Sequence, residues 1–158
     1  MAFKRRMIRE KVMQTLYAFE MSHEPIDFLL DQIAAPLKKD KETFEFAKSL
    51  TLKVIESSAE VDAMIRSRVE HWEFNRLAII DKVVLRIAIC ELLYFDDIPP
   101  KVSINEAIEI ARTYSTEKSD KFVNGVLDSI YSDLKKNSRM KKTGRGLQDL
   151  GPQKPKSR

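Results

Sequence analysis

Residues 80–95 read IDKVVLRIAICELLYF, a segment that is apolar on nearly every side when it is wound into a helix. A helix that is hydrophobic all round is stable in water only when other elements enclose it. Pro99 and Pro100 follow and end the region, because proline does not continue a helix. The segment therefore predicts a central, buried helix with the rest of the chain packed around it.

The segments on either side of this helix have apolar residues at steps of three and four, which is typical of helices with one buried face. Before it, the spacing predicts a first helix that ends ahead of Pro25, a short helix over 27–35 and a long unbroken helix over 43–71. After it, Ser103 and Glu106 match a capping box and predict a helix that begins at Ser103. A last helix is predicted over 119–135.

Glycine is too rare for a protein built from tight β-turns. Gly125 is the only glycine in the first 143 residues, and no Asn-Gly or Asp-Gly pair separates two alternating apolar runs. The chain is therefore predicted to be all-α. Gly125 itself interrupts a helical pattern, where glycine costs about 1 kcal/mol relative to alanine. We favour the close approach of another helix as its reason, over the close approach of an RNA backbone.

The length of 158 residues allows one domain with a sizeable core, and the charge divides this chain into two parts. Nine of the 28 Lys and Arg residues lie in residues 135–158, where Asp149 is the only acid. The first 134 residues hold the other 19 basic residues and 23 acidic ones. We expect a folded domain over 1–135 and a basic tail over 136–158, rich in Gly and Pro and mostly disordered.

The single cysteine and the lack of a long apolar run indicate the cytoplasm. Cys90 cannot form an internal disulfide, and its apolar neighbours predict a small buried side chain rather than a catalytic thiol. No segment approaches the roughly 18 consecutive apolar residues of a membrane span. The basic start of the chain is not followed by an apolar stretch, so it is not a signal peptide.

The residue patterns of catalysis and of cofactor binding are missing. His23 and His71 lie 48 residues apart, and neither has a partner at metal-ligand spacing. The glycine-rich loops that hold phosphates or dinucleotides are absent, and so is the sharp turn of a serine nucleophile. The sequence therefore predicts a protein that is not an enzyme and has no cofactor or metal.

Basic charge at the start of the first helix favours a polyanionic partner. Arginine forks match phosphate oxygens, and a helix N-terminus adds backbone N–H donors and the positive end of a dipole. A basic helix end is just as often only a solvated surface, so this pattern alone leaves nucleic-acid binding open. The cluster consists of Lys4, Arg5, Arg6, Arg9 and Lys11, opposed only by Glu10.

Two further features fit an RNA partner. Tyr17 lies two turns beyond Arg9 and could stack on an unpaired base, although a partly buried aromatic is the commoner explanation. Lys118 and Lys121 lie at the start of the last helix, where a phosphate would meet free N–H groups.

Taken in order, these segments resemble the NusB family over roughly residues 4–135. Any one of them is a weak match, but the combination is specific. The resemblance rests on KVSINEAIEIA at 101–111, KFVNGVLD at 121–128, VLRIA at 84–88 with EL at 91–92, and RR, RE and QTLY at 5–6, 9–10 and 14–17.

The resemblance implies a fold of two three-helix bundles packed across each other. It implies binding of the boxA RNA of ribosomal RNA leader transcripts, as a heterodimer with NusE, a ribosomal protein of the small subunit. The pair would join an antitermination complex on RNA polymerase. It leaves open whether the free chain forms a homodimer.

The resemblance also assigns residues to the two binding surfaces. It implies that the RNA side is formed by the start of the first helix, Tyr17 and the turn before the last helix. It implies that the partner side lies at the junction before the central helix and on that helix. The RNA-side residues are Lys4, Arg5, Arg6, Arg9, Tyr17, Lys118, Lys121 and Phe122, and the partner-side residues are Trp72, Asn75, Arg76 and Asp81.

Two other functions remain open at this stage. NusB-like helical domains also occur ahead of RNA cytosine methyltransferase domains, as accessory modules without catalysis of their own. A helical scaffold that binds only protein is the other alternative, and it would not depend on the charges of Arg5, Arg6 and Arg9.

Overall fold

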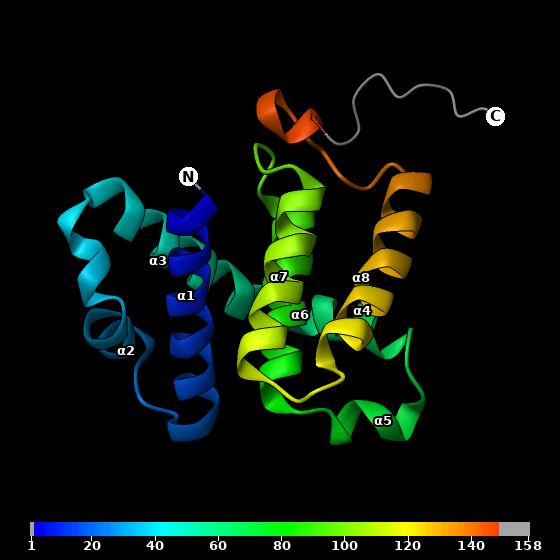
Figure 1. Cartoon of the computed structure of the whole chain (residues 1–158), viewed down its shortest axis with the longest axis horizontal. Helices are drawn as coiled ribbons and strands as arrows, with labels where there is room; N and C mark the ends of the chain where they lie inside the picture. Colours follow the sequence, from blue (N-terminus) through cyan, green and yellow to red (C-terminus); the bar gives the residue numbers. More distant parts are fainter. Residues whose placement is uncertain (1, 149–158) are drawn as a thin grey trace.

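Helices make up nearly all of the regular structure (Figure 1). The computed structural model describes residues 2–148, with the backbone alone for residues 2, 3 and 71–73. Within these bounds no strand occurs, which confirms the all-α prediction. The elements are α1 (Ala2–Ser22), α2 (Ile26–Ile33), the 3-10 helix η1 (Ala35–Lys39), α3 (Lys41–Glu56), α4 (Ser58–Arg66), α5 (His71–Arg76), α6 (Ile79–Tyr94), α7 (Pro100–Tyr114), α8 (Ser119–Lys136) and the 3-10 helix η2 (Gly144–Leu147).

The longer helices form two groups of three. In Figure 1, α1, α2 and α3 pack together on one side, and α6, α7 and α8 pack together on the other. The two groups meet because α1 and α3 both contact α6, while α4 packs on α6 as well. This arrangement confirms the two three-helix bundles that the resemblance implied.

The centre of the molecule is α6, as its all-round apolar sequence predicted. Leu85, Ile89 and Cys90 are fully buried there. The apolar surface of α6 is covered on one side by α1 and α3 of the other bundle and by α4. On the other side it is covered by α7 and α8 of its own bundle. None of the helices in residues 2–148 combines the length and the apolar character needed to cross a membrane.

The expected unbroken helix over 43–71 is wrong. Ser57 ends α3 with φ −96° and ψ 9°, and α4 begins at the next residue. The Ser57 hydroxyl and its backbone N–H both donate to the carbonyl oxygen of Lys53, at 2.8 and 2.9 Å. A serine that bonds back to the preceding turn bends a helix, and here the bend lets α3 and α4 follow the surface of α6.

The capping box predicted at Ser103 is also wrong, because α7 begins earlier, at Pro100. Proline suits the first position of a helix, where its fixed φ is helical and its missing N–H is not needed. Ser103 and Glu106 therefore lie inside α7 and are both buried. Their side chains bind residues of other helices instead of the helix end.

Residues 137–148 pack against the body, so the expected disorder of the tail does not hold for them. Lys142 is buried and donates to the carbonyl oxygens of Glu91 and Phe95, at 3.0 and 2.8 Å. The lysine thus adds a charged donor at the C-terminus of α6, where both carbonyl oxygens also accept a backbone N–H. The Thr143 N–H donates to the carbonyl oxygen of Asp96 at 2.9 Å. The expectation for residues 149–158 lies outside the described residues.

Candidate nucleic-acid interface

The first turns of α1 carry three basic side chains that reach solvent. Lys4 is exposed, and its ammonium forms an ion pair of 3.0 Å with Asp40 at the start of α3. That ammonium and the Thr43 hydroxyl hold the pKa of the Asp40 carboxyl below its usual value. Arg5 is partly exposed and has no ion pair among the described residues. Its Nε atom is enclosed and has no hydrogen-bond acceptor.

Arg6 links α1 to α7 and remains accessible. Its Nε and Nη2 atoms donate to the two carboxylate oxygens of Glu106, at 2.6 and 3.2 Å. These hydrogen bonds raise the pKa of Arg6, and 37% of its side chain is exposed. Arg6 therefore offers a guanidinium edge to a phosphate while Glu106 fixes its position.

Arg9 lies in the interior, against the expectation that it faces solvent beside Arg5 and Arg6. It is 2% exposed, and its Nε and Nη2 atoms donate to the carboxylate of Glu91 in α6, at 2.7 and 2.8 Å. The Ser103 hydroxyl donates to the same carboxylate at 2.6 Å. Burial works against the charge of Arg9, but attraction to Glu91 outweighs it and raises the arginine's pKa. Arg9 joins α1 to α6 and is not available to RNA.

Two exposed tyrosines belong to α1 and α7, the pair of helices that Arg6 links. Tyr17 is exposed, as stacking on a base would require. Tyr114, at the end of α7, is exposed to the same degree. Partial burial and the nearby Glu10, with which it hydrogen-bonds, raise the pKa of Tyr114, and Gln14 is a second hydrogen-bond partner. Sequence analysis missed Tyr114, because only the packing of α7 brings it next to α1.

The start of α8 presents Lys118 and Lys121, both exposed, as predicted from their position at a helix N-terminus. Phe122 is half-buried and packs against the core. Asp120 lies between the two lysines in sequence, but Arg112 of α7 donates to its carboxylate at 3.1 Å. That hydrogen bond lowers the pKa of Asp120, and the ion pair offsets its negative charge.

Gly125, one turn further along α8, has no helix next to it. It is exposed, and a Cβ atom added there would meet nothing within 4 Å. The prediction of a closely packed neighbouring helix is therefore wrong. A glycine inside a helix lowers stability, and in the described part of the chain no close neighbour requires the absence of a side chain at this position.

Replacing Gly125 with Ala is expected to raise the free energy of unfolding by about 0.5–1 kcal/mol, because alanine loses less backbone entropy in a helix. Urea unfolding would show this as a higher midpoint with an unchanged slope. Gly144 is the matched control: it also has open space, but its φ of +53° lies in the left-handed region that favours glycine over alanine, so Gly144→Ala should lower the midpoint. A lower midpoint for Gly125→Ala would contradict the prediction.

The side expected to meet a protein partner is only partly at the surface. Asn75 and Arg76 lie on α5 and are exposed. The side chain of Trp72 lies outside the described residues. Asp81 is buried, with 6% exposure, and its Oδ2 atom accepts a hydrogen bond of 2.9 Å from the hydroxyl of Ser119. Asp81 thus joins α6 to α8 and does not reach a partner's surface, contrary to the expectation.

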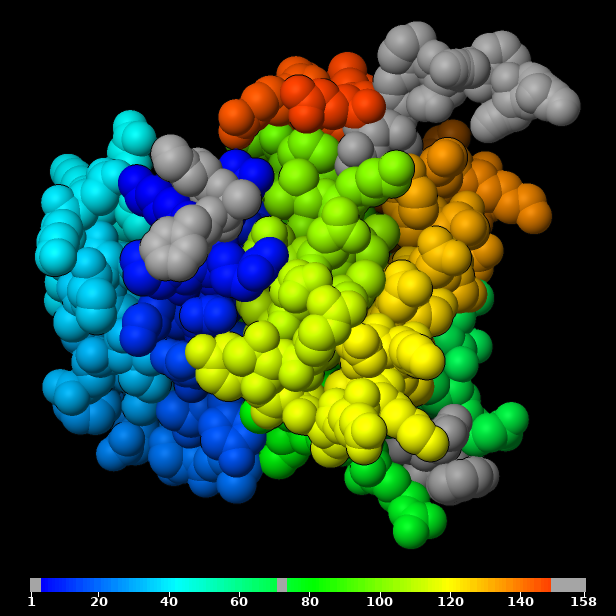
Figure 2. Space-filling model, in the orientation of Figure 1, coloured from blue at the N-terminus to red at the C-terminus, as the bar shows by residue number. Residues whose placement is uncertain are grey.

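The basic start of α1 and the start of α8 lie at opposite ends of one face. Figure 1 shows the N-terminus of α1 at one end, and α8 beginning at the other end, next to the last turn of α7. In Figure 2 the start of α1, the length of α7 and the start of α8 all lie on the visible face. The predicted RNA-side residues other than Arg9 therefore form an elongated surface along α1 and α7, rather than a compact site. We name it the α1–α7 face.

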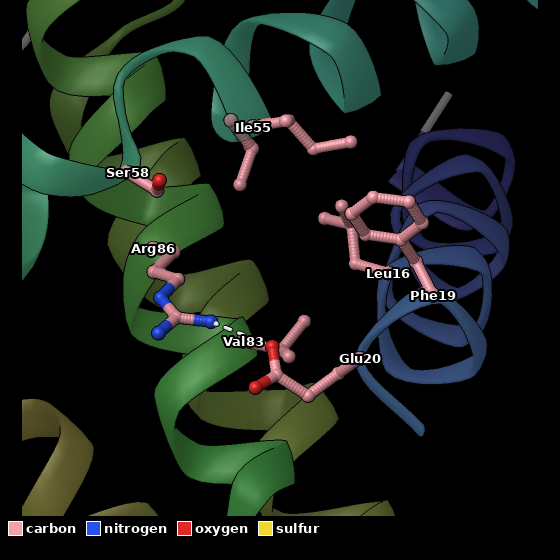
Figure 3. A pocket seen from close by; sticks show the side chains of 8 residues that line it. Leu16, Phe19, Glu20, Ile55, Ser58, Val83 and Arg86 are labelled. Atoms are coloured by element: carbon pink, nitrogen blue, oxygen red, sulfur yellow. Dashed lines mark hydrogen bonds and ion pairs between the residues drawn. The ribbon is translucent and has the colours of Figure 1, made fainter. Parts of the chain in front are cut away.

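A small apolar cavity of about 130 Å³ between the two bundles does not add to this site (Figure 3). It is lined by Leu16 and Phe19 of α1 and by Arg86 of α6, among others. The guanidinium of Arg86 is already bound by Asp62, at 2.8 and 3.0 Å, and by Glu20, at 3.4 Å. The cavity therefore carries no free charge that calls for a ligand.

Comparisons with known proteins agree with this architecture. The model of the NusB family matches residues 6–132. The chain is 47% identical to the transcription antitermination protein NusB of Chloroherpeton thalassium, over 98% of this chain and 74% of the relative. It is 46% identical to the protein of the same name from Salinibacter ruber, over 90% of each.

Solved structures are similar over most of the chain. One is NusB of T. maritima, with a TM-score of 0.75 and 40% identity over 82% of this chain and 91% of that one. Another contains antitermination factors NusB and NusE in complex with double-stranded RNA, with a TM-score of 0.75 and 26% identity over 84% of this chain and 99% of that one. The chain therefore belongs to the NusB family.

Proposed function

We propose that this protein is a transcription antitermination factor that binds single-stranded boxA RNA along the α1–α7 face, as a heterodimer with NusE. The observation that carries the proposal is the free guanidinium of Arg5 beside Lys4 and Arg6, in a chain of the NusB family. A solved structure similar to this chain contains NusB and NusE in complex with double-stranded RNA. The pair would join the cytoplasmic complex on RNA polymerase and would act without catalysis.

The shape of the α1–α7 face supports an extended, single-stranded ligand. Its basic side chains are distributed between the start of α1 and the start of α8, so one strand would have to run along α7 to meet both. Tyr17 in the second half of α1 and Tyr114 at the end of α7 are both exposed and offer aromatic rings to unpaired bases. Single-stranded RNA is bound in this way, by phosphate contacts that fix its course and stacking that accepts exposed bases.

The partner proposal rests on α5, which in Figure 1 lies beyond the start of α8, at the end of the molecule opposite the N-terminus of α1. Asn75 and Arg76 are exposed there, and we propose that they contact NusE, whereas Asp81 is left out because it is buried. Separate surfaces for RNA and protein would allow both partners to bind at once. RNA affinity should then increase when the partner is present.

Arg5→Gln is expected to weaken binding of a short boxA RNA about tenfold and to lower the slope of log affinity against log salt by about one, because one phosphate contact is lost. Fluorescence anisotropy at two salt concentrations, with and without NusE, measures both effects. Arg5→Lys should bind with intermediate affinity, since it retains charge but not the fork.

Lys136→Gln is the matched control, because it removes one exposed charge at the far end of α8. A scrambled RNA of equal length tests sequence preference. If Arg5→Gln and Lys136→Gln behave alike, or if the unaltered protein binds both RNAs equally well, the α1–α7 face is not a specific RNA site. A scaffold that binds only protein would then be the better explanation.

A further inference from the structure

A larger pocket, of about 470 Å³, lies where four segments meet at the N-terminal end of α1. These segments are the starts of α1 and α3, the loop between α6 and α7, and the C-terminal segment around η2. Its volume falls within the roughly 300–1,000 Å³ that is usual for small-ligand sites. The C-terminal segment lies beyond the residues that the family model matches, so the family resemblance does not account for this wall.

Two guanidinium groups without ion pairs line this pocket, Arg5 from α1 and Arg145 from η2. Arg145 is exposed and, like Arg5, forms no ion pair or hydrogen bond through its side chain within residues 2–148. Arg6 and Arg9, by contrast, are each held by a carboxylate. Two free arginine forks that converge on one pocket are suited to an anionic group such as a phosphodiester.

The remainder of the lining suits a nucleobase better than a bare anion. Ile8, Phe46 and Val102 contribute apolar surface, and the ring of Phe46 is fixed edge-on against Phe95. Carboxylates also line the pocket. Asp40 is engaged by Lys4 and by the start of α3, and Glu42 is exposed at the same helix start. Asp97 is exposed in the loop and can accept a hydrogen bond from an amino group of a base.

Contacts of the neighbouring residues hold the backbone at Arg145 against the loop between α6 and α7. Lys142 is anchored on the C-terminus of α6 three residues earlier, and the Thr143 N–H is bonded to Asp96. Gly146 follows directly, and a Cβ atom there would lie 1.9 Å from the carbonyl oxygen of Asp96. Only glycine allows this close approach, so Gly146 is what lets η2 lie against the loop.

We propose that this pocket binds one splayed-out nucleotide of single-stranded RNA, with Arg5 and Arg145 on its phosphates and its base against the apolar lining near Phe46. The C-terminal segment is then part of the RNA site and not a solvated tail. This inference rests on the proposed function and extends the α1–α7 face beyond the residues of the family match. Binding of an unstacked base in a pocket is a general mode of single-stranded RNA recognition.

Three variants of the full chain test this pocket with a short single-stranded boxA RNA, followed by fluorescence anisotropy. Arg145→Gln removes the charge, and Gly146→Ala leaves every charge in place but forces η2 away from Asp96. Lys141→Gln is the matched control, because it removes one exposed charge from the same segment. Lys141 lines a different pocket, next to Glu60 and Tyr94.

Arg145→Gln and Gly146→Ala are each expected to weaken binding about five- to tenfold. The double variant should bind RNA as tightly as either single variant, because both changes remove the same contact of Arg145 with the RNA. Lys141→Gln should change affinity less than twofold. Equal effects of Arg145→Gln and Lys141→Gln, or unchanged affinity in Gly146→Ala, would overturn the pocket and leave the proposed function intact. Failure of the unaltered chain to prefer boxA would overturn the proposed function, and the pocket with it.

Discussion

Replacing Glu91 with Gln is expected to lower the free energy of unfolding by about 3–5 kcal/mol, because it leaves the buried guanidinium of Arg9 without its counter-charge. The two side chains are 2% and 0% exposed, so water cannot take the place of the lost partner. The loss should appear in urea unfolding as a lower midpoint with an unchanged slope.

The geometry of this pair explains why the effect should be so large. Arg9 binds both oxygens of Glu91 through parallel hydrogen bonds of 2.7 and 2.8 Å, which is the strongest arrangement of these groups. Ser103 adds a third hydrogen bond, at 2.6 Å. The cluster joins α1, α6 and α7, so it connects the two bundles at the centre of the molecule. An amide at position 91 would turn a donor toward the guanidinium.

The double variant Arg9→Met with Glu91→Leu is the control for this prediction. It removes both charges and fills the same volume with apolar groups, and such replacements of buried pairs are often neutral or stabilising. We expect it to be at least about 2 kcal/mol more stable than Glu91→Gln. If Glu91→Gln costs less than about 1 kcal/mol, the pair is not desolvated as the structure describes.

The features of the fold that depend on local pattern could be predicted. The apolar residues 80–95 became the buried α6, and the predicted last helix over 119–135 corresponds to α8. The break at Ser57 could not be predicted, because serine is tolerated inside helices and only the curvature around α6 selects the bent form. Likewise Ser103 and Glu106 match a capping box in sequence, but Pro100 starts the helix one turn earlier.

The candidate site was predictable in its residue types but not in the direction that each side chain faces. Arg5, Arg6 and Arg9 look equivalent along the sequence, yet they are free, paired at the surface and buried, respectively. The difference depends on Glu91 and Glu106, which lie 82 and 100 residues away from their partners. A single basic helix contains no signal for such distant carboxylates, so Arg9 was expected at the surface.

The thiol of Cys90 is expected to react with a thiol reagent at pH 8 at least about a thousandfold more slowly in the native protein than in the urea-unfolded chain. The side chain is fully buried, and burial raises its pKa from 9.0 to about 12. Since only the thiolate is nucleophilic, a rise of this size alone lowers the reactive fraction about a thousandfold. Labelling must then proceed through opening of α6.

The same shift determines how stability depends on pH. Above pH 9 the unfolded thiol ionises while the native thiol stays protonated to about pH 12, so stability is lost as pH rises through this window. Cys90→Ala should remove that part of the alkaline loss. Glu91→Gln, next to Cys90 in α6, should speed labelling about a hundredfold or more if opening equilibrates faster than reaction. Rapid labelling of the unaltered protein would mean that α6 is not the closed centre of the fold.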